Sequence, residues 1–459
     1  MTARRTIVIP ILAAVALTIL ALPLPSNAAP EVLPAMALTV FTIGMWASGS
    51  LPEHLTAIAF FLLAMIFSIA PPGVVFSGFQ SSAFWLVFGG MILGVAADNT
   101  GLGRYVAHAL SGKLDTTYPR LISGIVFVSI ALAFLVPSAI GRMIILTPII
   151  LGVADHLGFD AGSRGRTGMV LATTFGCFFV PLTILPANLV NVVLAGAADT
   201  LYGVSINYGE YLLMHFPITG LLKGVVIIIL ICLIFPQPMP DKRQPRPEPP
   251  ILSPDGRRLT IIIGFALVAW MTDFLHGVPP GWIALIAAFA CLLPTLGVLR
   301  ADDMRNYANL GSLLYVAAIL GLGAVVASTG SGGLIADGLL AVTRFDPSTP
   351  AYNYAAFTAI GILLCTFATL PGSVIVLAPF ADQVAEATGW PLLTVLMILV
   401  NGFSTLFLPY QSAPILVGLR LGGATMGQAT RITLPLAAIT ICILLPLNYL
   451  WWQWLGYLP

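Results

Sequence analysis

Apolar segments of the length that crosses a lipid bilayer follow one another along almost the whole chain. A membrane-spanning helix needs about 20 predominantly apolar residues. In the first half, the segments lie near residues 6–25, 34–50, 54–70, 82–98, 120–136, 139–154, 168–184, 187–198 and 208–236. In the second half, they lie near residues 259–275, 280–297, 309–328, 351–369, 371–387, 391–408, 411–419 and 430–455. This pattern predicts an all-α polytopic membrane protein.

Some of these segments are too short to cross alone, and prolines divide them into pairs. Segments 120–136 and 139–154 meet at Val136-Pro137-Ser138, and segments 351–369 and 371–387 meet at Leu370-Pro371-Gly372. We interpret the ranges 120–154 and 351–387 as two re-entrant hairpins.

Two further segments are broken at Pro181 and Pro186, and at Pro409 and Pro414. They predict unwound helices, because broken backbone at membrane depth is tolerated only when it is buried in protein or lines a cavity.

One long polar, proline-rich stretch divides the chain almost in half. We interpret residues 237–258 as a linker, residues 34–236 as a first repeat and residues 259–459 as a second. Residues 1–33 are interpreted as a retained first transmembrane helix, and a cleaved signal peptide is the alternative.

The amino-acid composition and the motif content exclude several classes of function. Of the 459 residues, 58% are hydrophobic and 8% are charged, whereas soluble domains carry about 25% charged residues. The 19 Lys and Arg against 18 Asp and Glu leave no basic excess for a nucleic-acid partner. The chain contains no H-E-x-x-H and no G-x-S-x-G motif, so we expect no enzyme and no cofactor beyond a coupling ion.

The few basic residues predict an orientation, because cytoplasmic loops carry an excess of Lys and Arg. With a cytoplasmic N-terminus, sixteen of the 19 fall on the cytoplasmic side, Arg344 falls outside, and Arg142 and Lys223 stay within the membrane. We therefore expect eleven crossings and two hairpins in the inner membrane. The 237–258 linker is then cytoplasmic and the C-terminus lies outside.

The two halves share glycine and proline spacings. Gly94, Thr100, Gly101 and Gly103 recur in the same order and at the same spacing as Gly323, Thr329, Gly330 and Gly332. Gly141, Pro148 and Gly158 recur as Gly372, Pro379 and Gly389, Pro181 and Pro186 recur as Pro409 and Pro414, and Gly209 and Pro217 recur as Gly427 and Pro435. With the expected orientation the repeats are inverted, and inverted repeats with interrupted helices are typical of secondary transporters with a site at the midplane.

Several motifs resemble those of the divalent anion/sodium symporter family, which transports dicarboxylates, citrate and sulfate. They are Trp46-Ala47-Ser48-Gly49-Ser50-Leu51-Pro52, Phe76-Ser77-Gly78-Phe79-Gln80, Trp85-Leu86-Val87-Phe88-Gly89-Gly90, Thr100-Gly101-Leu102 and Tyr208-Gly209-Glu210-Tyr211. The resemblance implies a homodimer with a scaffold domain and a transport domain that carries substrate by an elevator movement.

The motifs that bind sodium and carboxylate in this family are degenerate in the chain. The family's Ser-Asn-Thr tips correspond to Ser138-Ala139-Ile140 and Thr369-Leu370-Pro371. The family's unwound Thr-Pro-Pro-Asn-like motifs correspond to Leu185-Pro186-Ala187-Asn188 and Gln411-Ser412-Ala413-Pro414. The resemblance therefore implies the fold more strongly than it implies sodium coupling.

Arg142 is the sharpest candidate, because an arginine within the membrane is costly and usually functional. It follows the first tip by one turn and suits a carboxylate or sulfate, which a guanidinium binds through two hydrogen bonds. A structural ion pair or snorkelling to the cytoplasm is the alternative. The substrate-binding candidates are Ser138, Gly141, Arg142, Asn188, Thr369, Ser373, Gln411 and Ser412, and those for sodium are Ser138, Asn188, Thr369 and Ser412.

The other polar residues have plainer interpretations. Ser138 would also serve as a helix cap, and Thr183 and Asn191 are weaker candidates for the site. Lys223 lies in the apolar run 216–235, and we expect its long side chain to snorkel to the membrane surface.

We expect a secondary active transporter of a small anion, either a di- or tricarboxylate or sulfate. The site carries no Asp or Glu, which argues against a cation substrate. The coupling ion stays open between Na⁺, H⁺ and exchange. The alternatives are an anion channel of the same fold and a homologue that binds a ligand without transporting it.

Overall fold

The computed structural model describes residues 2–24, 29–111, 117–240, 251–296, 298–300, 310–331 and 343–459. Every regular element among these residues is helical, as the sequence predicts. Outside them lie part of the expected linker (241–250), Gly332 of the expected repeat, and the basic residues Lys113, Lys242, Arg243, Arg246 and Arg305.

The first half of the chain forms twelve α-helices in the described residues. They are α1 (Thr2–Leu20), α2 (Val32–Ser48), α3 (Glu53–Ile66), α4 (Pro72–Val75), α5 (Ser82–Thr100), α6 (Leu102–Ser111), α7 (Tyr118–Leu135), α8 (Ala139–His156), α9 (Arg164–Phe178), α10 (Leu189–Tyr202), α11 (Tyr208–His215) and α12 (Lys223–Ile234). Short 3-10 segments η1 (Ser77–Phe79), η2 (Val180–Thr183) and η3 (Leu185–Ala187) and the π-helical segment η4 (Phe216–Leu222) join some of them.

The second half repeats the order of long helices, hairpin and broken helix. Its helices are α13 (Pro254–Met271), α14 (Asp273–His276), α15 (Pro280–Leu292), α17 (Leu310–Ser328), α19 (Pro350–Phe367), α20 (Leu370–Leu377), α21 (Ala381–Thr388), α22 (Leu392–Phe403), α23 (Ala413–Gly422), α24 (Met426–Ile439) and α25 (Leu445–Trp454). The short segments are η6 (Ala378–Phe380), η7 (Pro409–Gln411) and the π-helical η8 (Thr440–Leu444). Helix α13 therefore begins before the expected end of the linker.

Seven helices of the described residues are long and apolar enough to cross a membrane by length and composition. They include α7, α8 and α19, which are three of the hairpin arms. Each has 18 residues, and a helix of that length spans about 27 Å. Because arms of this length approach the thickness of the bilayer core, the re-entrant path of the hairpins stays a prediction.

The equivalent ends of α5 and α17 have the same local structure. Thr100 Oγ1 donates to the carbonyl of Ala96 at 2.7 Å, and Thr329 Oγ1 donates to that of Val325 at 2.8 Å. Gly101 and Gly330 follow with φ of 70° and 73°, which glycine adopts without the steric penalty of a Cβ. This pair of helix ends agrees with the expected recurrence of Thr100-Gly101 at Thr329-Gly330.

The expected pairing of Pro186 with Pro414 does not match the ends of the broken helices. Asn188 precedes α10 and Ser412 precedes α23, both with extended backbone. Counted back from these two residues, Pro186 corresponds in position to Tyr410 rather than to Pro414. The expected alignment is wrong at the break, because there the helix ends, and not the prolines, recur.

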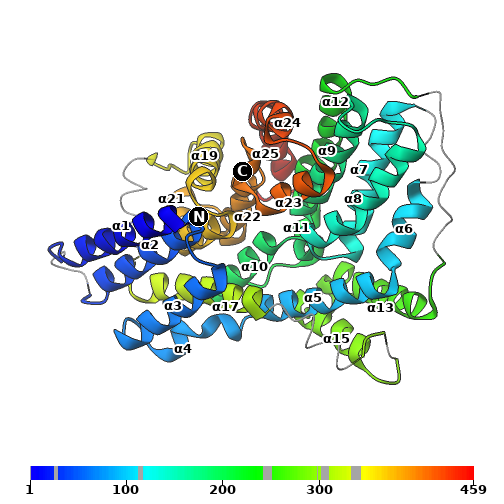
Figure 1. The fold of residues 1–459 in the computed structure, drawn as a ribbon. Coiled ribbons are helices and arrows are strands. Elements are labelled where there is room, and N and C mark those ends of the chain that lie inside the picture. The colour runs from blue at the N-terminus through cyan, green and yellow to red at the C-terminus, as the bar shows by residue number, and fades with distance from the viewer. Residues whose placement is uncertain are drawn as a thin grey trace.

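The helices form two groups that pack against each other. The platform consists of α2, α3, α5, α13, α15 and α17, and the hairpin bundle consists of α7–α12 and α19–α25. Figure 1 shows α3, α5, α13, α15 and α17 along one side of the molecule and α7–α9, α12 and α24 on the other. Helix α10 contacts both α5 and α17, and α20 contacts α17, so these helices form much of the boundary between the groups.

Candidate functional site

The first hairpin tip is a short extended turn between α7 and α8. Ser138 caps α8, and its Oγ accepts a hydrogen bond from the backbone N–H of Gly141 at 3.1 Å. The seryl side chain is exposed and Gly141 is half-buried. Ser138 therefore fills the expected capping role, and its hydroxyl keeps a hydrogen to donate.

The second tip repeats this geometry at the position that the repeat pairs with Ser138. Thr369 caps α20, and its Oγ1 accepts from the backbone N–H of Gly372 at 3.1 Å. Ser373 is buried, and its Oγ donates to the carbonyl of Leu370 at 2.7 Å and lies 3.1 Å from Cys365 Sγ. The side chain of Ser373 therefore stabilises the first turn of α20.

Arg142 joins the first hairpin tip to the first broken helix. Its side chain is fully buried. Nη1 donates to the carbonyls of Val136 at 2.7 Å and Ala187 at 2.9 Å, and Nη2 donates to that of Cys177 at 2.8 Å. Arg142 forms no ion pair with an acidic group in the part of the chain that the structure describes. It neither snorkels nor forms an ion pair there. It donates to two carbonyls at the break between α9 and α10, those of Cys177 and Ala187, and to that of Val136 at the tip, which also accepts from the backbone N–H of Ser138.

The first broken helix runs from α9 through η2 and η3 to α10. Asn188 Nδ2 donates to the carbonyl of Phe178 at 3.4 Å, and Asn191 Nδ2 donates to those of Pro181 and Ile184 at 3.3 and 2.9 Å. Thr183 Oγ1 donates to the carbonyl of Val180 at 2.6 Å. All three polar side chains are buried, and each satisfies backbone that is no longer helical.

The second broken helix runs from α22 through η7 to α23. Gln411 Oε1 accepts from the backbone N–H groups of Phe407 at 2.9 Å and Leu408 at 2.7 Å, and Nε2 donates to the carbonyl of Cys365 at 3.1 Å. Gln411 therefore joins the second break to the first arm of the second hairpin. The Oγ of Ser412 is buried and has no hydrogen-bond partner among the residues that the structure describes.

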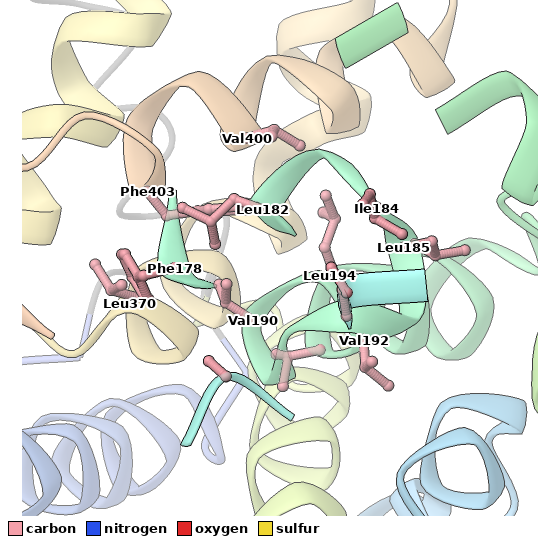
Figure 2. Packing of buried hydrophobic residues seen from close by; sticks show 14 of the residues in the cluster. Phe178, Leu182, Ile184, Leu185, Val190, Val192, Leu194, Leu370, Val400 and Phe403 are labelled. Atoms are coloured by element: carbon pink, nitrogen blue, oxygen red, sulfur yellow. The ribbon is translucent and has the colours of Figure 1, made fainter. Parts of the chain in front are cut away.

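The predicted residues thus form two clusters, one in each half. Ser138, Gly141, Arg142 and Asn188 lie around the first tip and break, and Thr369, Ser373, Gln411 and Ser412 lie around the second. Helix α10 contacts α20 and α22, which brings the clusters toward one another. Figure 2 shows buried apolar side chains of both halves gathered there, among them Phe178, Leu182, Leu370 and Phe403.

Lys223 does not snorkel, and that expectation is wrong. Its side chain is fully buried, and Nζ donates to the carbonyl of Ser404 at 2.9 Å and lies 5.9 Å from the centre of the Phe179 ring. Phe179 and Ser404 are the residues that directly follow α9 and α22. The negative ends of two helix dipoles stabilise a cation there, which the position of a lysine within an apolar run does not reveal.

The donor set is poor in metal ligands. No group of three or more His, Cys, Asp or Glu side chains within the described residues would hold a metal ion. A sodium ion prefers carbonyl and hydroxyl oxygens, and four such carbonyls near the breaks already accept from Arg142 or Lys223.

Hairpins beside two broken helices, in an all-helical chain that crosses a membrane several times, are characteristic of secondary transporters. A family model described as the sodium:sulfate symporter transmembrane region matches residues 4–458. The chain belongs to this family of multi-pass membrane transporters, whose members are not enzymes.

Curated relatives agree with this assignment. A membrane protein of Cupriavidus necator is 24% identical, with 96% of this chain and 91% of the relative covered. The inner membrane protein YbhI of Escherichia coli is 26% identical over 83% of this chain and 82% of its own length. The L-tartrate/succinate antiporter of E. coli is 25% identical over 74% of this chain and 72% of its own length.

Two solved structures share the fold. The YdaH transporter of Alcanivorax borkumensis has a TM-score of 0.57 at 15% identity, covering 94% of this chain and 99% of its own. MtrF of Neisseria gonorrhoeae, from a class of antimetabolite efflux pumps, has a TM-score of 0.53 at 14% identity, covering 93% of this chain and 96% of its own. At these identities the similarity concerns the fold alone.

Proposed function

We propose that the chain is a secondary transporter that exchanges small divalent anions, with dicarboxylates as the main substrates and sulfate as the alternative. The observation that carries the proposal is the pair Arg142 and Lys223. Both side chains are fully buried beside the broken helices, and neither pairs with an acidic side chain within the described residues.

The charge of this pair sets the charge of the substrate. A buried ion without an opposite partner costs several kcal/mol, even after the protein relaxes. A divalent anion would neutralise both cations, whereas a carrier without substrate would have to move two uncompensated charges through the membrane. The carrier would therefore cross the membrane only with an anion bound, both inward and outward, and transport of this kind is exchange.

Arg142 has the donors that a divalent anion needs. A guanidinium carries five N–H groups, of which three donate to the carbonyls of Val136, Ala187 and Cys177. Within the described part of the chain the Nε–H has no partner, so this hydrogen and the remaining Nη2 hydrogen are left for an oxyanion. Because the side chain is fully buried in this arrangement, the hairpin tip has to move before an anion reaches it.

Sodium coupling is less well supported than exchange. The carbonyls of Val136, Ala187, Cys177 and Ser404 would suit a sodium ion, but they accept hydrogen bonds from cationic side chains. A relative named an L-tartrate/succinate antiporter supports exchange of dicarboxylates, and the name of the family model supports sulfate and sodium.

The movement that we propose is of the elevator type. The platform would be the fixed scaffold of a homodimer, and the hairpin bundle would be the transport domain, with the substrate between the two tips. The eight candidate residues named above would bind the anion as the tips open. The N-terminus would face the cytoplasm and the C-terminus the outside of the inner membrane.

Counterflow in proteoliposomes tests the proposal. Vesicles with the full chain are loaded with unlabelled succinate, tartrate or sulfate, and uptake of the labelled anion is followed with and without sodium. We expect saturable, sodium-independent uptake into loaded vesicles and none into empty ones. Uptake into empty vesicles driven by a sodium gradient would contradict exchange, non-saturating flux would favour a channel, and binding without flux would favour a ligand-sensing homologue.

A further inference from the structure

Asp199 links the hairpin bundle to the platform. It lies near the end of α10, and its Oδ2 accepts from the backbone N–H of Ser82 at 3.3 Å. The same oxygen lies 3.3 Å from the Oγ of Ser82 and 3.5 Å from that of Ser81. Ser81 and Ser82 begin α5 of the platform, so the carboxylate of one group satisfies the free N–H end of a helix in the other.

Asp273 makes the reverse connection. It follows α13 of the platform, is buried, and accepts through Oδ2 from the backbone N–H of Tyr208. Tyr208 is the first residue of α11 in the hairpin bundle, and Asn207 before it makes no side-chain cap. Asp273 therefore supplies from the platform the cap that α11 lacks. The ring of Tyr208 also stacks on Trp270 of α13, with 6.0 Å between the ring centres.

The two contacts lie at either end of one short connection. Residues 203–207 join α10, which carries Asp199, to α11, which receives Asp273. A small pocket opens at this boundary, and its lining includes Ser82, Asp199, Ser205 and Gly281. The pocket therefore lies beside the Asp199 contact, at the boundary between the two groups.

We propose that Asp199 and Asp273 are a reciprocal pair of helix caps that locks the hairpin bundle to the platform. A hydrogen bond fails when its heavy atoms separate much beyond about 3.5 Å. A shift of several ångströms between the groups would therefore break both caps together, because the connection 203–207 ties Asp199 to Tyr208. The pair holds the arrangement seen here, and it opens as one unit when the groups move.

Hydrogen exchange of the full chain in lipid nanodiscs tests this without requiring transport. Peptides covering residues 82–86 and 208–212 are followed by mass spectrometry in Asp199→Asn, in Asp273→Asn and in the double variant. Loss of a cap speeds amide hydrogen exchange at the end of the helix by about fivefold. We expect each single variant to speed hydrogen exchange by this factor in both peptides. The rate of hydrogen exchange in the double variant should be only slightly higher than that in the stronger single variant.

A local role for each cap gives a different result. Each variant would then change only the helix that it caps, the effects would add in the double variant, and the proposal would be overturned. No change in either peptide would overturn it as well. Asp199 is only half-buried, so we expect Asp199→Asn to fold even if Asp273→Asn does not. Hydrogen exchange of residues 208–212 in Asp199→Asn then distinguishes coupled caps from independent ones. Glu386→Gln, at an exposed position of α21, is the matched control.

Discussion

The ammonium group of Lys223 donates to the carbonyl of Ser404 at 2.9 Å and thereby joins a helix of the first half to the break of the second. The same side chain lies over Phe179, which follows the helix that is broken in the first half. A single cation therefore sits at the carbonyl ends of both broken helices, where the helix dipoles favour it.

Replacing Lys223 by methionine should change the charge of the preferred substrate. Methionine is unbranched and one heavy atom shorter than lysine, so the variant removes the charge with little loss of volume. Arg142 is then the remaining buried cation of the pair. Because each uncompensated buried charge costs several kcal/mol, we expect exchange of divalent anions to fall at least about tenfold. The rate of exchange of a monovalent carboxylate should rise relative to that of a divalent anion.

The measurement is counterflow of labelled succinate and of a labelled monocarboxylate with the same reconstituted protein. Lys223→Arg keeps the charge and is the matched control, in which the preference should stay divalent. An unchanged ratio of the two rates in Lys223→Met would show that the lysine does not set the charge of the substrate.

Arg142→Lys should separate the charge of Arg142 from its geometry. A lysine keeps the positive charge, but its compact ammonium does not reproduce the planar fork that reaches three carbonyls. A buried carbonyl left without a donor costs about 1–3 kcal/mol. We expect a lower Tm and at least about a tenfold lower rate of exchange, with the divalent preference retained. A variant with normal Tm and rate would contradict the role of Arg142 at the tip.

Ser138→Ala and Thr369→Ala should destabilise the protein to a similar extent. Both hydroxyls accept from a glycine N–H at 3.1 Å, one at each hairpin tip, and loss of such a cap costs about 1 kcal/mol. Thermal unfolding of the single and double variants should show two similar, additive decreases in Tm. Ser123→Ala in α7, whose hydroxyl donates to a carbonyl one turn back at Pro119, is the control. A much larger effect at one tip would indicate that the tips are not equivalent.

The sequence predicts the helices well because polar backbone exposed to lipid is costly. Long apolar segments therefore mark the helices, and prolines and glycines mark where the helices end or break. The sequence also predicts the tips, since Ser138 and Thr369 are cap-forming residues at equivalent places in the two halves. It does not predict the partners of Arg142, Lys223 and Gln411. Those partners are backbone groups, and the amino-acid identities do not indicate where a broken helix presents its free carbonyls.

The alignment of the two breaks failed for a related reason. Prolines mark where a helix is interrupted, but the start of the next helix depends on which residue adopts the extended backbone of an N-cap. Asn188 and Ser412 do so here, although neither side chain accepts a capping hydrogen bond from its helix. Asn and Ser are residue types that are frequent at this position. A comparison of capping residues would therefore have paired Asn188 with Ser412, which the prolines do not do.

The crossing of α19 and α22 should tolerate no side chain at Gly402. A Cβ there would lie 2.8 Å from the carbonyl carbon and 2.9 Å from the Cα of Gly361, and backbone atoms do not move aside as a flexible side chain does. Overpacking of this kind costs about 1–3 kcal/mol, so Gly402→Ala should lower Tm. Gly427→Ala in α24 is the matched control, because a Cβ at Gly427 meets no heavy atom of the described residues within 4 Å. Since α19 is an arm of the second hairpin and α22 ends at the break, the substitution should also slow exchange by displacing the tip. A Gly402→Ala protein with the Tm and exchange rate of the control would contradict the close crossing.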